Sequence, residues 1–109
     1  YILGIYRPPK ADLEDSLKVL SQGLDKITLW NSEIIIVGDI NVDNFEKASN
    51  PNKTKLNEYL ANYNIQRLDI GTTRKTLTSE TSIDCVCTNI DQKDIQINIL
   101  STGISDHKA

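Results

Sequence analysis

Apolar residues recur at helical spacing in two stretches of the chain. The first stretch predicts a helix over residues 12–30, with an N-cap at Asp12 and acids in its first turn, where the helix dipole favours them. Its apolar stripe consists of Leu13, Leu17, Leu20, Leu24 and Ile27. A second helix is expected after Asn50 and Pro51, which read as an N-cap followed by proline in the first turn. Its core face consists of Leu56, Tyr59, Leu60 and Tyr63.

Short apolar segments before, between and after these helices predict β-strands. The expected strands cover residues 1–6, 33–37, 65–70, 82–88 and 94–100. The second is apolar without alternation, so we expect a central strand that is covered on both faces. The last alternates isoleucine with polar residues, so we expect one exposed face. Strands and helices in this order predict an α/β (α+β) domain with layered secondary structure.

Composition narrows the range of functions. A chain of 109 residues with a net charge of −3 is large enough for one small domain and is not a basic, nucleic-acid-coating protein. Nucleic acid would have to be held locally, for example through a metal ion. Apolar runs fall far short of the ~20 residues that a membrane helix needs, so no membrane partner is expected. Cys85 and Cys87 would share one face of a strand, which disfavours a disulfide and favours a reducing, intracellular setting.

Asp39 and Asn41 are the first residues with candidate chemistry. They follow the buried strand directly, and they point to the same side if the backbone stays extended. A carboxylate beside an amide can hold a water molecule and a phosphate oxygen together, and ligands in α/β sheets bind at the carboxyl ends of strands. Asp and Asn are also ordinary turn residues, so a plain turn is the alternative.

Asp84 and the pair Asp106-His107 are the other candidates. His107 is the one histidine in the chain, and an imidazole can donate to a phosphoryl oxygen or move a proton near neutral pH. Asp106 could bind a divalent metal. Asp84 lies in an apolar strand, where a carboxylate needs a partner, and a histidine would suit it. The alternatives are a solvated surface histidine and an acid on the exposed face of an edge strand.

Four short motifs together resemble one known superfamily. They are Ile5-Tyr6-Arg7-Pro8-Pro9, Ile36-Val37-Gly38-Asp39-Ile40-Asn41, Ser82-Ile83-Asp84 and Ser105-Asp106-His107. Their order and spacing are similar to those of the endonuclease/exonuclease/phosphatase superfamily, closest to the endonuclease domain of non-LTR (LINE-like) retrotransposons. The pairs Thr73-Arg74 and Thr88-Asn89 fit the same pattern. The resemblance implies the carboxy-terminal part of a four-layer α/β sandwich of the DNase I-like type.

The resemblance also implies catalytic roles. Asp39 would orient and help to deprotonate the attacking water, and Asn41 would hold that water or the phosphate. Asp106 would bind the divalent metal, usually Mg²⁺. His107 would stabilise the charge on the pentavalent phosphorus, and Asp84 would orient His107. The reaction would be metal-assisted hydrolysis of a phosphodiester.

Substrate contacts and partners follow from the same resemblance. Tyr6 would contact the scissile phosphate or a water held by the metal, and Arg74 would touch the DNA backbone. Residues 1–109 would be a partial domain that lacks its amino-terminal half, which carries the glutamate that is a principal metal ligand in the family. The expected partners are DNA, that missing half and a downstream reverse transcriptase, and a retrotransposon product would act in the nucleus.

Three interpretations remain open at this stage. The parent domain is expected to be an Mg²⁺-dependent endonuclease, with the 109 residues inactive by themselves. A phosphatase of the same superfamily is the enzymatic alternative. A catalytically silent remnant, or a binding module, is the alternative without catalysis.

Overall fold

The computed structural model of the protein describes residues 1–28, 32–45 and 50–100, and four strands in this part form one mixed sheet. In spatial order the strands are β1 (Ile2–Tyr6), β2 (Ile35–Asp39), β6 (Asp84–Thr88) and β3 (Gln66–Arg67). β1 and β2 are parallel, while β6 runs antiparallel to both of its neighbours. A separate hairpin pairs β4 (Arg74–Lys75) with β5 (Glu80–Thr81). The α/β class expected from the sequence is confirmed.

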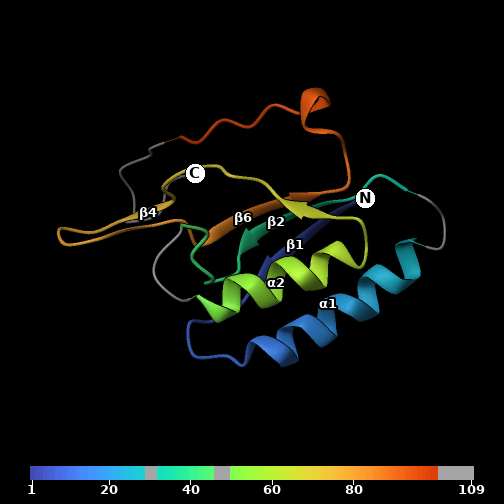
Figure 1. The fold of residues 1–109 in the computed structure, drawn as a ribbon, viewed down its shortest axis with the longest axis horizontal. Coiled ribbons are helices and arrows are strands. Elements are labelled where there is room, and N and C mark those ends of the chain that lie inside the picture. The colour runs from blue at the N-terminus through green and yellow to red at the C-terminus, as the bar shows by residue number, and fades with distance from the viewer. Residues whose placement is uncertain (29–31, 46–49, 101–109) are drawn as a thin grey trace.

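Two helices in the described part, α1 (Leu13–Thr28) and α2 (Pro51–Ala61), lie on the same side of the sheet (Figure 1). Both predicted N-caps are present: the Asp12 carboxylate accepts a hydrogen bond from the Glu14 N–H at 3.0 Å, and the Asn50 side chain accepts one from the Lys53 N–H at 3.1 Å. The predicted apolar stripes meet the sheet in one core. Its most buried members are Leu24, Ile34, Ile36, Ile40 and Leu60.

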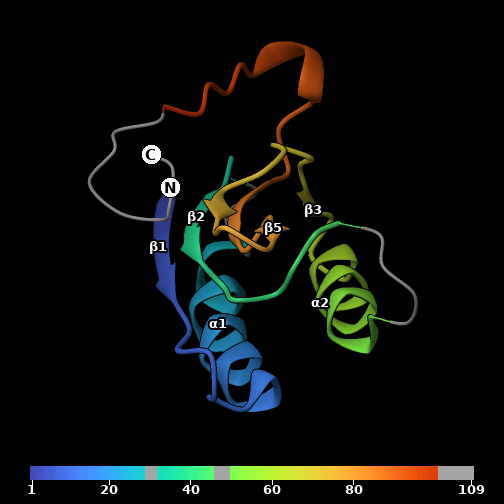
Figure 2. The ribbon, with the colours of Figure 1, turned by 90° about the vertical axis from the view of Figure 1, so that its left-hand side faces the viewer.

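The strands pack one face on the helices and turn the other away from them (Figure 2). In β1, Leu3 and Ile5 contact the core, whereas Ile2 is 75% exposed. In β6, the two cysteines are buried as free thiols on the core face, as the alternation predicted. The face away from the helices is called the open face here. It carries Ile2, Gly4, Tyr6, Ile35, Val37, Asp39, Asp84 and Val86.

β2 differs from its prediction in position. It runs from Ile35 to Asp39 rather than over residues 33–37, so it continues through Gly38. Gly38 has φ +144°, and a Cβ at this position would lie 1.9 Å from the Ile5 carbonyl oxygen, so glycine alone permits β1 to pair here. β2 is central, as expected, and in the described part the helices cover one of its faces, while Ile35 and Val37 on the other face are half-buried.

Two of the strands predicted after α2 are shorter than expected or do not pair. β3 forms over Gln66–Arg67 only, a short part of the predicted segment 65–70. In the predicted strand 94–100, the isoleucines are half-buried and alternate with exposed residues, but the segment pairs with no described strand. It follows a 3₁₀ helix, η1 (Gln92–Asp94), and passes on the open-face side of the sheet (Figure 1). The alternation of apolar and polar residues therefore indicates which side chains are half-buried in this segment, and it does not indicate pairing with another strand.

Thr88 and Asn89 fix the start of β2 from the end of β6. The Thr88 hydroxyl donates to the Ile34 carbonyl at 2.7 Å, and the Asn89 side-chain carbonyl accepts from the Ile34 N–H at 2.8 Å. The Asn89 amide also donates to the Ser32 carbonyl. This pair therefore has a structural role at the end of the sheet opposite to Asp39 and Asp84. No helix in the described ranges is long and apolar enough to cross a membrane.

Candidate active site

Three of the residues selected from the sequence lie side by side on the open face. The strand register places Tyr6 opposite Asp39, and Asp39 opposite Asp84, on three neighbouring strands. Directly opposed residues project from the same face of a sheet. Tyr6 is 70% exposed, and the two acids are partly buried. We call Tyr6, Asp39 and Asp84 the polar row. It occupies the carboxyl ends of the parallel strands β1 and β2.

Asn41 also lies at this end of the sheet, but in a backbone conformation that the sequence did not predict. The backbone does not stay extended, because Asn41 has φ +52° in the left-handed region. The chain turns directly after Asp39, and the Asp39 carboxylate accepts a hydrogen bond from the Asn41 N–H at 3.0 Å. The extended backbone that would put Asp39 and Asn41 on one side is therefore absent, and the alternative of a turn applies. Asn41 instead lies beside Arg7, whose carbonyl accepts from its side-chain amide at 2.6 Å.

The loop that carries Asn41 is tied to the start of β6. The N–H groups of Ile40 and Asn41 both donate to the Ile83 carbonyl, at 3.1 and 3.2 Å. Further along the loop, the Asp43 carboxylate accepts from the Ser82 N–H at 2.9 Å, and the Asn44 N–H donates to the Ser82 carbonyl at 2.8 Å. These bonds hold the segment after β2 against the segment before β6. The positions of Asp39 and Asp84 are therefore coupled by backbone contacts as well as by the ladder.

Thr73 supports Asp84 from the other side, and the sequence alone assigned it no role of its own. Its hydroxyl oxygen accepts hydrogen bonds from the N–H groups of Ile83 and Asp84, at 3.0 and 3.1 Å, and the residue is 2% exposed. The signal in the sequence was the pair Thr73-Arg74, which fits the motif pattern. Arg74, the predicted DNA contact, follows Thr73 immediately and is exposed on β4.

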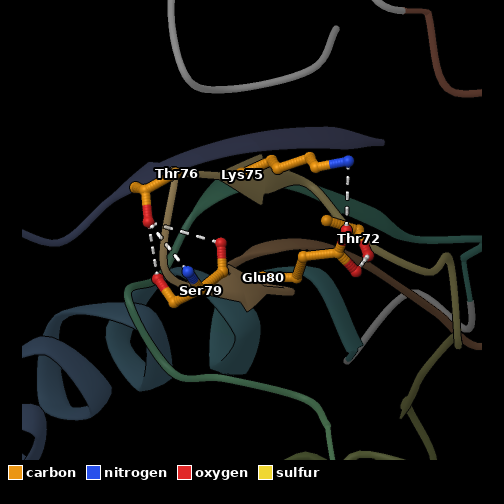
Figure 3. Close-up of polar contacts among 5 residues, drawn as sticks. All are labelled: Thr72, Lys75, Thr76, Ser79 and Glu80. Atoms are coloured by element: carbon orange, nitrogen blue, oxygen red, sulfur yellow. Dashed lines mark hydrogen bonds and ion pairs between the residues drawn. The ribbon is translucent and has the colours of Figure 1, made fainter.

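The β4–β5 hairpin beyond Arg74 is held by its own polar contacts (Figure 3). The Lys75 ammonium lies 3.4 Å from the Glu80 carboxylate, and the Thr76 and Ser79 hydroxyls lie 2.8 Å apart across the turn. Leu77 in this turn is fully exposed. The ion pair is itself exposed and contributes little stability. These contacts all lie within the hairpin, which projects from the sheet next to Asp84.

Arg67 is a second residue that the sequence did not reveal. One of its terminal nitrogens, Nη2, donates to the carbonyl oxygens of Ser82 and Asp84, at 2.9 and 3.4 Å. Burial lowers the pKa of the Arg67 guanidinium, while the neighbouring cysteines and the acids Asp43 and Asp84 act in the opposite direction. An arginine remains protonated at neutral pH even so. A positive charge therefore lies behind the strand end that carries Asp84.

Asp106 and His107 lie outside the described residues. The predicted contact between Asp84 and His107, and the metal-binding role of Asp106, stay predictions. Within the described ranges, no group of three or more His, Cys, Asp or Glu side chains could hold a metal ion. The described part of the site thus consists of the polar row, Asn41 and the adjoining Arg74.

The site thus lies on a mixed α/β sheet, with Asp39 at the carboxyl end of β2 and Asp84 at the start of the antiparallel β6. The chain belongs to the endonuclease-reverse transcriptase family, which it matches over residues 1–109. The resemblance inferred from the four motifs is confirmed. Among curated proteins, no sequence matches the chain.

A solved structure shows the same fold. The chain is similar to the endonuclease domain of TRAS1, a telomere-specific non-LTR retrotransposon, with a TM-score of 0.69 and 18% sequence identity. The superposition covers 94% of this chain and 52% of that one, so the chain spans about half the length of the TRAS1 domain. This confirms the expected fold class, an α/β domain of the DNase I-like type.

Proposed function

We propose that residues 1–109 form the carboxy-terminal half of an endonuclease domain that hydrolyses a phosphodiester bond in DNA. The observation that carries the proposal is the polar row, in which a hydroxyl and two carboxylates from three strands project from one end of an open sheet face. The match to an endonuclease-reverse transcriptase family over the whole chain supports it. The chain spans about half the length of the TRAS1 domain, and the rest of such a domain would cover the open face.

Each described residue has a role that its position allows. Asp39 accepts a proton from the attacking water, because its carboxylate lies at the edge where a phosphate can approach. The Asn41 amide, held beside Arg7, orients that water or a phosphate oxygen. The Tyr6 hydroxyl, on the most exposed strand of the row, donates to a phosphate oxygen. Asp84 orients the imidazole of His107, which neutralises the charge that develops on the phosphoryl oxygens.

The donor chemistry of the row fits Mg²⁺. Carboxylate oxygens are the ligands that Mg²⁺ prefers, and it commonly binds through one or two carboxylates together with waters and substrate phosphate. Asp39 and Asp84 are directly opposite across the β2–β6 ladder, so two carboxylates lie at the same end of the open face. Asp106 and a carboxylate from the amino-terminal half would complete the ligand set. When bound, the metal would polarise the phosphoryl group and steady the leaving oxygen.

DNA would approach the open-face end of the sheet from the side of the β4–β5 hairpin. Arg74 is exposed there, one residue from the threonine that supports Asp84, so its guanidinium could pair with a backbone phosphate. The nick would supply a primer end for a reverse transcriptase encoded downstream, which places the reaction in the nucleus.

Nicking of supercoiled plasmid by the complete domain in Mg²⁺ tests the proposal. Asp39→Asn keeps the shape of the side chain but removes the base, and we expect it to slow nicking by about a hundredfold or more. Asp15→Asn is the matched control, because Asp15 is exposed on α1 and lies outside the site. Equal rates for Asp39→Asn and the parent domain would refute the assignment. A complete domain that never nicks would instead support a silent remnant or binding module.

A further inference from the structure

Arg7 is a buried charged residue to which the site described above gives no chemical role. It directly follows β1 and is 6% exposed. Burying a guanidinium is costly unless its donors are satisfied. Here, Nη1 donates to the carbonyl oxygens of Ile40 and Asn41, each at 3.2 Å, and Nη2 donates to that of Ala11 at 2.7 Å. The guanidinium therefore joins the loop after β2 to the segment before α1.

The contacts between Arg7 and Asn41 run in both directions. Arg7 donates to the Asn41 carbonyl, and the Asn41 side-chain amide donates back to the Arg7 carbonyl at 2.6 Å. In addition, the Arg7 N–H donates to the Asp39 carbonyl at 2.8 Å, which continues the β1–β2 pairing by one step. Arg7 thus contacts the backbone on both sides of Ile40 and also fixes the orientation of the Asn41 amide.

The conformation that Arg7 holds is an uncommon one. Asn41 has φ +52°, a region that residues other than glycine seldom occupy, although asparagine tolerates it better than most. Such a conformation persists only where the surroundings impose it. The bonds from Arg7 and from the two loop N–H groups to Ile83 supply that constraint. Lysine could not replace them, because its single ammonium lacks the planar fork that reaches carbonyls on two segments.

We propose that Arg7 is a positioning residue that sets the left-handed backbone and the side-chain orientation of Asn41, and through them the geometry of the catalytic loop. The proposal about geometry stands on the contacts above. Its consequence for catalysis rests on the proposed function.

Hydrogen exchange in the chain tests the geometric part without any activity. Arg7→Lys should accelerate exchange of the Ile40 and Asn41 amides by about tenfold relative to those of Cys85 and Cys87, because lysine cannot keep the three hydrogen bonds that the Arg7 guanidinium makes. Leu60→Ala, a core change in α2, is the control for general destabilisation. It should not accelerate exchange at Ile40 and Asn41 more than at Cys85 and Cys87. Uniform acceleration over the whole sheet in Arg7→Lys, or no change at Ile40 and Asn41, would overturn the proposal.

A measurement on the parent chain covers the case in which Arg7→Lys does not fold. The Nη protons of a guanidinium bonded to three carbonyls exchange slowly, so those of Arg7 should persist in nuclear magnetic resonance spectra where those of free arginine in the same buffer do not. Equally fast exchange of both groups would also overturn the proposal.

Nicking by the complete domain tests the catalytic part through a double-mutant cycle. If Arg7 acts through Asn41, the double variant Arg7→Lys/Asn41→Ala should have a kcat within about twofold of Asn41→Ala alone. Multiplicative losses would show that Arg7 acts elsewhere and would overturn this part. If both Asp39→Asn and Asn41→Ala nick at the parent rate, the proposed function fails, while the exchange result still decides the geometry.

Discussion

Replacing Gly38 with alanine is expected to disrupt the sheet at the polar row. A Cβ at this position would lie 1.9 Å from the oxygen and 2.8 Å from the carbon of the Ile5 carbonyl, both of which are backbone atoms that no rotamer change can move. The φ of +144° is also a conformation that L-residues rarely adopt. Alanine must therefore rotate the backbone before Asp39 or push β1 away from β2.

The size of the effect follows from these two costs. A residue held in a region that is essentially restricted to glycine costs about 1–3 kcal/mol. Overpacking against a fixed neighbour costs about another 1–3 kcal/mol. The expected loss is about 2–6 kcal/mol, a large part of the roughly 5–15 kcal/mol that stabilises a small domain. Since Tyr6 pairs with Asp39 one residue further along, the same displacement would separate the members of the polar row.

Urea unfolding at low protein concentration, followed by circular dichroism, measures the loss. Two other glycines are matched controls. At Gly4 a Cβ would meet nothing within 4 Å, and at Gly23 it would meet only a Leu3 methyl at 3.8 Å, so alanine at either should be neutral or stabilise by up to about 1 kcal/mol. A Gly38→Ala midpoint equal to that of the parent, or equal to that of Gly4→Ala, would refute the argument from steric contact.

Three further predictions concern the helices and the open face. Asn50→Ala should lower the stability of the chain by about 1 kcal/mol in urea unfolding, whereas Asn50→Gly should cost only a few tenths, because glycine is an acceptable N-cap. Tyr59→Phe removes the bond from its hydroxyl to the Leu17 carbonyl at 2.8 Å, which joins α2 to α1. Burial raises the pKa of Tyr59 above its ordinary value of 10.0, so the unfolded chain ionises first, and stability should fall as the pH rises through about 10. The phenylalanine variant should lose less between neutral and alkaline pH in the same urea assay, and identical slopes would contradict this. The 109-residue chain should bind a hydrophobic fluorescent dye, because the open face exposes apolar side chains. The same chain in Mg²⁺ should not nick plasmid, because the metal ligand expected from the amino-terminal half is missing. A dye-free monomer with a cooperative melt, or nicking that Asp39→Ala abolishes, would count against a missing half.

The helices and their caps could be predicted because they depend on local sequence. Spacings of three and four residues mark the buried leucines of α1, and the caps at Asp12 and Asn50 need only residues two or three positions away. The neighbourhood of Asp39 and Asp84 could also be predicted, through a resemblance of motifs. Its physical basis, the register of three strands, appears only in the structure.

The remaining features depend on contacts between distant segments. The backbone of Asn41 has a left-handed conformation that contacts with Arg7 and Ile83 hold in place. Both partners are distant in the sequence, so the loop sequence alone does not predict this conformation. Gly38 stays within β2 because β1 approaches it closely, whereas a glycine next to an aspartate ordinarily indicates a turn. Alternation over residues 94–100 reports which side chains are half-buried, but it could not show whether a neighbouring strand would pair with them.

The place of β6 in the sheet has a consequence for biosynthesis. β6 is the last strand of the sheet along the chain, yet it is inserted between β2 and β3, which are both made earlier. Until β6 leaves the ribosome, those two strands have edges without a partner, and such edges favour aggregation. Asp84 is the first residue of β6, so the insertion of β6 between β2 and β3 also completes the polar row. A nascent chain that stops before β6 is therefore expected to need chaperone protection, and of the polar row it contains only Tyr6 and Asp39.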